Sequence, residues 1–69
     1  MISYLNETIK LKPNYVDARY AKALTYSKLI KTDSKNAQEY KQIEFEELNY
    51  ILKNIDPDHK ASKDLLKSL

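Results

Sequence analysis

Glycine is absent from this chain of 69 residues, and proline occurs only twice, at Pro13 and Pro57. The stretches that the prolines separate are rich in good helix formers, and the glycine-containing turns of tight β-hairpins are missing. Proline disfavours helical geometry in the residue before it, so each proline marks a boundary between helices. The sequence therefore predicts an all-α chain that is divided at Pro13 and Pro57.

Two amphipathic segments flank Pro13. In residues 2–11, apolar side chains recur at spacings of three and four, which is the stripe of an amphipathic helix. The second segment, from Tyr15 to about Lys31, has apolar side chains on two flanks, so we expect neighbouring helices on more than one side of it. Its small residues, which would let those neighbours come close, are Ala18, Ala21 and Ala23. Asn14 is expected to cap the N-terminus of this second helix.

A polar stretch at residues 32–36 separates the second segment from a third. Asp33 or Ser34 is expected to cap the helix that follows, because short polar side chains accept hydrogen bonds from free amides. From Ala37 the apolar positions keep helical spacing with one slip near Phe45, which predicts a helix of about 20 residues.

Pro57 ends this third helix, and Asp58 is expected to start a fourth, since its side chain and charge both favour a helix N-terminus. The apolar face of the fourth helix consists of Ala61, Leu65, Leu66 and Leu69. Together the four segments predict four helices in three antiparallel turns.

Short motifs accompany both prolines. Ahead of Pro13 stand a large apolar residue, a small residue and a closing apolar pair, namely Leu5, Thr8, Ile9 and Leu11. After it come two alanines and an aromatic residue, namely Ala18, Ala23 and Tyr26. Ile55 and Asp56 precede Pro57, and residues 58–61 resemble the opening of a further helix. This pattern resembles the tetratricopeptide repeat, in which a helical hairpin of about 34 residues ends near a proline.

The resemblance implies antiparallel helical hairpins of α-solenoid type, with residues 1–69 as one helical-repeat domain of roughly one and a half repeats. Proline to proline is 44 residues, ten more than the repeat, which places an insertion at about residues 32–41. The insertion would lengthen the third helix or enlarge the loop before it. Residues that depart from the family pattern are Arg19, Lys22, Phe45, Asn49 and Leu52. A generic four-helix bundle stays open as the alternative fold.

In the repeat family, the first helix of each hairpin lines a groove that binds a protein or peptide. The residues that fall on that face here are Asp17, Tyr20, Leu24, Ser27 and Lys28. The resemblance therefore implies a non-catalytic interaction scaffold with these residues as its binding site. Packing of Tyr20 and Leu24 against an adjacent helix is the alternative reading. The extended third helix, around Lys35 to Phe45, is the other place where we expect a specific contact.

Few residues are suited to catalysis or metal binding. The chain has no cysteine, and its one histidine, His59, lies beside Asp58 at an expected helix start. A metal site needs several converging ligands, and a nucleophilic serine needs a base. We therefore expect no catalytic residues, no metal and no cofactor, with His59 as a solvated turn residue. The third helix should carry a solvated acidic face formed by Glu39, Glu44, Glu46 and Glu47.

The formal net charge is only +2, which is too balanced to indicate nucleic acid or an anionic membrane as the partner. No run approaches the roughly 20 apolar residues that cross a bilayer, and the absence of cysteine suits a reducing compartment, so we expect a cytoplasmic protein. Repeat arrays need about three units to be stable alone, so we expect a fragment of a longer array, a self-associating unit or a subunit of a larger complex. RNA binding through Arg19, Lys22 and the six tyrosines is the alternative function.

Overall fold

The computed structural model describes residues 2–69, and these residues form four α-helices and no β-strand. The helices are α1 (Ile2–Leu11), α2 (Val16–Thr32), α3 (Ala37–Tyr50) and α4 (Lys60–Lys67). A 3₁₀ turn, η1 (Ser34–Asn36), precedes α3, and a π-helical segment, η2 (Ile51–Ile55), continues it. The predicted all-α class and the number of helices are confirmed.

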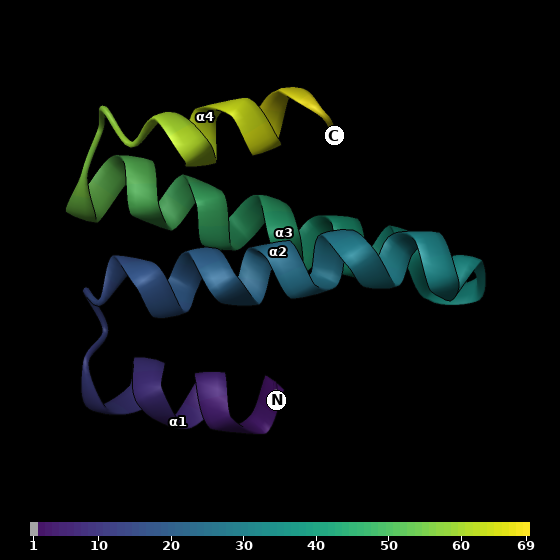
Figure 1. Ribbon diagram of the computed structural model, residues 1–69, viewed down its shortest axis with the longest axis horizontal. Helices are drawn as coiled ribbons and strands as arrows, with labels where there is room; N and C mark the ends of the chain where they lie inside the picture. Colours follow the sequence, from purple (N-terminus) through teal and green to yellow (C-terminus); the bar gives the residue numbers. More distant parts are fainter. Residues whose placement is uncertain (1) are drawn as a thin grey trace.

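Helices that are consecutive in the sequence are neighbours in space and run antiparallel (Figure 1). α2 packs against α1 on one side and, most extensively, against α3 on the other, while α4 packs against α3. The Cα atoms extend over 31 × 26 × 14 Å, with a radius of gyration of 11.4 Å. The third extent is small, so the helices form a thin slab in which no side chain lies far from a broad face.

The core of this slab is small and is centred on the interface between α2 and α3. Its fully buried apolar side chains are Ala23 on α2, Leu48 on α3 and Ile51 on η2. Ala18 is also buried on α2, and Leu5 is the buried residue of α1. As expected from its alanines, α2 has neighbours on two sides, because residues without a long side chain let the flanking helices approach.

The buried face of α3 includes two glutamates that were expected to be solvated. The buried residues of this helix and its extension are Glu44, Glu47, Leu48 and Ile51, a run with the spacing of one helical face. Phe45, where the apolar spacing slips, is 48% exposed. The slip in the apolar spacing near Phe45 arises because a glutamate occupies the core position beside it.

Beyond Tyr50 the helical path continues without a break through η2, so residues 37–55 are helical throughout. The segment ends on a bond from the backbone N–H of Asp56 to the carbonyl of Ile51, 2.8 Å long, which spans five residues as in a π-turn. The expected long third helix is therefore present, and the loop before it is short.

The helix caps differ from those expected at two turns. Tyr15 rather than Asn14 precedes α2, and no side chain caps that helix. Asn36 precedes α3, again with no side-chain cap. The carboxylate of Asp33 instead accepts hydrogen bonds from the Asn36 amide at 3.0 Å and the Tyr40 hydroxyl at 3.1 Å. These bonds, that of Asn36 first, lower the pKa of Asp33 below its ordinary value although partial burial opposes them.

Candidate functional site

The five residues predicted to form a groove on α2 lie at three different places. Leu24, Ser27 and Lys28 line a pocket between α2, α3 and α4. Tyr20 packs edge-on against the ring of His59, with 5.6 Å between the ring centroids. Asp17 borders a separate hollow between α1 and α2. The structure thus brings together three of the five, and Tyr20 has the packing role that was its alternative reading.

The pocket between these three helices, here called the α2–α4 pocket, has a volume of about 370 Å³. Its lining is mixed. The apolar side chains are Leu24 and Ile30 from α2, and Leu65 and Leu69 from the C-terminal part of the chain. Ser27 and Ser68 add hydroxyl groups.

Three lysines also line the α2–α4 pocket, and we call Lys28, Lys31 and Lys41 the lysine rim. All three are exposed. Within residues 2–69, none of the three takes part in an ion pair, since the four pairs in that range involve other residues. The mouth of the pocket therefore carries positive charge that no carboxylate of the described chain neutralises.

Glu44 is the remaining lining residue, and it corrects the expectation of a fully solvated acidic face. Its side chain is only 1% exposed, and neither carboxylate oxygen has a hydrogen-bond partner among the described residues. Burial raises the pKa of Glu44 above its ordinary value, because removing a carboxylate from water disfavours its charged form. An ionisable group thus lies at the base of the pocket without a partner.

Glu47 is the second glutamate that was expected on the solvated face of α3 but is buried. One turn along α3 from Glu44, it is buried against α2. Its Oε1 accepts a hydrogen bond from Arg19 Nη1 at 2.9 Å, and its Oε2 lies 3.5 Å from Lys22 Nζ. Arg19 and Lys22, the two residues that depart most from the family pattern on α2, are therefore the cations that neutralise this carboxylate inside the helix interface.

Arg19 also fastens the turn at Pro13 to the end of α3. Its Nε donates to the Pro13 carbonyl at 2.8 Å, and its guanidinium carbon lies 3.7 Å from the centre of the Tyr50 ring. The Tyr50 hydroxyl in turn donates to Asn14 Oδ1 at 3.1 Å. Asn14 is thus used to bind α3 rather than to cap α2.

His59, expected to be solvated, is half-buried and caps α4. The backbone N–H of Ser62 donates to His59 Nδ1 at 3.3 Å, and Ser62 Oγ lies 2.6 Å from the same nitrogen. Ser62 itself is fully buried. Asp58, the expected helix start, lies in the turn, where its N–H donates to Asp56. The acceptor role of Nδ1 requires the uncharged imidazole ring.

Replacing His59 tests this cap. His59→Ala is expected to be less stable than His59→Asn by about 1 kcal/mol, because asparagine keeps an acceptor for the amide of Ser62 and alanine does not. Both variants lose the contact with Tyr20, so their difference isolates the cap. Urea denaturation followed by circular dichroism measures it, and equal stabilities would show that the cap contributes nothing.

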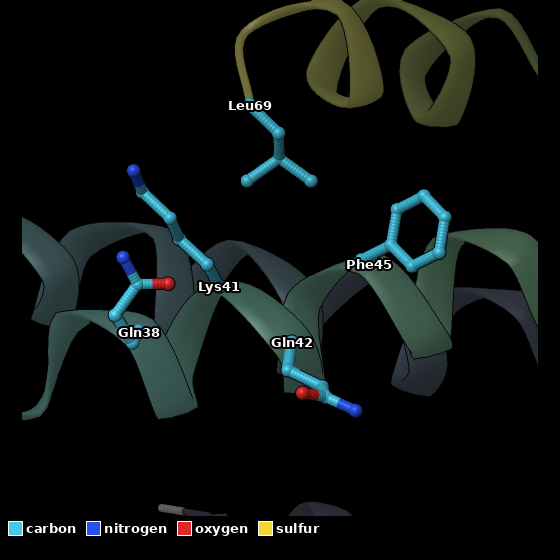
Figure 2. A pocket seen from close by; sticks show the side chains of 5 residues that line it. All are labelled: Gln38, Lys41, Gln42, Phe45 and Leu69. Carbon is cyan, nitrogen blue, oxygen red and sulfur yellow. The ribbon is translucent and has the colours of Figure 1, made fainter.

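A second hollow, of about 450 Å³, lies beside the first on the outer face of α3. Figure 2 shows the Leu69 side chain beyond α4 pointing towards α3, between Lys41 and Phe45, with Gln38 and Gln42 also on α3. Lys41 and Leu69 line both this hollow and the α2–α4 pocket. The exposed ring of Phe45 thus belongs to a surface that adjoins the candidate site.

Comparison of the chain with protein-family models, with curated proteins and with solved structures gives no match. The resemblance to the tetratricopeptide repeat accordingly stays a prediction. Across residues 2–69, the structure brings together no cluster of three or more His, Cys, Asp or Glu side chains that would hold a metal ion. No helix in that range is both long and apolar enough to pass through a bilayer.

Several residues of the site were missed by reasoning from the sequence, above all Glu44, Lys31 and Lys41. The signal for Glu44 was its spacing of four and seven residues from Leu48 and Ile51, which places all three on one face of a helix. Lys31 and Lys41 could not be recognised in this way, because lysines at the mouth of a pocket have the same spacing in the sequence as lysines on any solvated helix face.

Proposed function

We propose that this chain is a non-catalytic interaction module of tetratricopeptide-repeat type, which binds a protein or peptide at the α2–α4 pocket. The observation that carries the proposal is the pocket itself, where three helices supply apolar side chains next to a lysine rim without ion-pair partners in the described chain. Peptide sites commonly combine apolar side chains with a few polar groups that fix orientation.

Two further features support a binding role for the pocket. Three of the groove residues that the family resemblance implies, Leu24, Ser27 and Lys28, are among its lining. The antiparallel order of the helices is also what a repeat of helical hairpins requires, since each hairpin covers a face of the next.

RNA binding has less support as a second function. It depended on Arg19, Lys22 and the six tyrosines, and the two cations are half-buried and paired with Glu47. Their charge serves the interface between α2 and α3, which lowers their availability for phosphate groups. We therefore propose a protein or peptide as the partner.

Selection from a peptide display library tests this function. Peptides that the protein selects should lose about tenfold or more in affinity for Leu24→Ala, because apolar anchors at the centre of a site carry most of the binding energy. Leu11→Ala is the matched control, since Leu11 is 79% exposed on α1 and lies outside the α2–α4 pocket. Affinity is measured by fluorescence anisotropy at a temperature where both variants are folded. Selected peptides that bind both variants equally well would place the site elsewhere.

A further inference from the structure

The base of the α2–α4 pocket holds a carboxyl group that the fold does not use. Neither oxygen of Glu44 has a hydrogen-bond partner within residues 2–69, although its neighbour on the same face, Glu47, has two cations. An isolated buried carboxylate is costly, and native proteins rarely keep one unpaired. The arrangement therefore favours a neutral, protonated Glu44 whenever the pocket is shielded from water.

The charged groups around Glu44 are distributed unevenly among the helices. α2 contributes Lys28 and Lys31 to the pocket, and α3 contributes Lys41. Glu47, one turn further along α3, is already neutralised by its own pairs. The side chains that the C-terminal part of the chain adds, from Leu65 onward, are uncharged. The pocket thus presents a positive mouth above an apolar wall and a titratable base.

This charge distribution identifies the chemistry of the occupant. The lysine rim is complementary to carboxylates, and the leucine and isoleucine side chains of the wall are complementary to an apolar side chain. Among residues 2–69, no aromatic residue lines the pocket, whereas recognition of single-stranded RNA relies on bases stacked on aromatic rings. An acidic peptide that carries apolar residues fits all of these features.

We propose that the α2–α4 pocket receives an apolar side chain of an acidic peptide, that the lysine rim pairs with the peptide's carboxylates, and that Glu44 takes up one proton from the solvent as the peptide binds. This inference rests on the proposed function and specifies its partner. The bound peptide excludes water from the pocket and brings further negative charge towards Glu44, and both effects favour the neutral acid. The proton stays on a Glu44 oxygen, and no other bond changes.

The coupling between peptide and proton is reciprocal. A peptide that binds better to the protein with a protonated Glu44 must bind more tightly as pH falls. For a single proton, affinity weakens by up to about tenfold for each pH unit through which Glu44 loses its proton.

Two fluorescent probe peptides test the partner chemistry. Each has about a dozen residues with leucines at helical spacing, and the positions between them are glutamate in one probe and lysine in the other. The acidic probe should bind, and more weakly as salt is raised, while the basic probe should not. Lys28→Gln and Lys31→Gln should each weaken binding about twofold to fivefold, and Lys10→Gln on α1 should leave it unchanged.

The proton is tested by repeating the titration from about pH 5.5 to about pH 7.5, where glutamates of the free probe are ionised. Affinity should fall with rising pH for the wild-type protein and for Glu39→Gln, an exposed control on the same helix, but not for Glu44→Gln. Calorimetry in buffers with different protonation enthalpies should show proton uptake that Glu44→Gln abolishes. A pH dependence that survives in Glu44→Gln would come from another group and would overturn the proton step.

The outcomes separate this inference from the proposed function. If the basic probe binds in a manner that depends on Leu24, the pocket still binds peptides but the acidic partner is wrong. If neither probe binds and library peptides do not depend on Leu24, both proposals fail. Self-association that sedimentation detects and that Lys28→Gln abolishes would identify a second copy of the chain as the occupant of the pocket. Tight binding of homopolymer RNA that the same variant abolishes would identify RNA as the occupant. Either result overturns the inference.

Discussion

Glu47→Ala is expected to lower the free energy of unfolding by about 2–4 kcal/mol, because it leaves Arg19 and Lys22 facing each other in the α2–α3 interface without their shared carboxylate. A chain of 69 residues has a total stability of only about 3–10 kcal/mol. The variant should therefore lose a large fraction of its stability. Chemical denaturation followed by circular dichroism measures the change.

Glu46→Ala is the matched control for this experiment. Glu46 is the adjacent residue on α3, but its side chain is exposed and belongs to no ion pair among the described residues. Its substitution should change stability by no more than about 0.5 kcal/mol. Equal effects of the two substitutions would mean that the buried pair with Arg19 does not hold α2 and α3 together.

Glu44→Met is expected to act in the opposite direction, raising the free energy of unfolding by about 1–3 kcal/mol at neutral pH, since it removes a buried polar group that has no partner within residues 2–69. Methionine is flexible and close to glutamate in length, so it fills the same space without a charge. Thermal unfolding detects the change, and a melting temperature below that of the wild-type protein would contradict the account of Glu44 as an unpaired core residue.

The pH dependence of stability follows from the same residue. The pKa of Glu44 is raised in the folded state, so the folded protein holds this proton at pH values where the unfolded chain has lost it. The contribution of this proton to the free energy of unfolding is complete below the ordinary pKa of glutamate. It is lost as pH rises through the raised pKa of Glu44 in the folded state. Stability should therefore fall with rising pH in that window, and Glu44→Gln should remove this part of the dependence. Glu39→Gln, exposed on α3, should retain it.

The helices could be predicted from the sequence because prolines and apolar spacing act locally. Proline interrupts the interior of a helix, so the boundaries of α1, of α2 and of α3 together with η2 were predicted to within about two residues. The slip in the apolar spacing marked Phe45 as a departure from a regular apolar face, but it did not show which side chain would be buried against α2. That choice depends on the register between the two helices.

The polar residues of the interior were the least predictable part. Glu44 and Glu47 have the same residue type as the exposed Glu46, and their position on the face of Leu48 and Ile51 is the only local signal that distinguishes them. Burial of an ionised glutamate costs less where a distant cation reaches it, as Arg19 reaches Glu47 from 28 residues away. Charged residues are assigned to the surface by default, and such long-range pairing is invisible to that rule. The candidate site was therefore predicted only on its α2 side.

The short fourth helix has a consequence for the timing of binding. α4 spans only eight residues and makes its main contacts with α3 and η2, so it lies at one edge of the slab, held from one side. Helices held in this way open locally at lower free energy than the centre of a protein, and their amide hydrogens exchange sooner. Residues at its end, Leu65 and Ser68, form one wall of the α2–α4 pocket. Each local opening of α4 removes that wall from the pocket, so the lifetime of the closed helix limits how long a partner stays bound. A bound partner will in turn slow hydrogen exchange in α4.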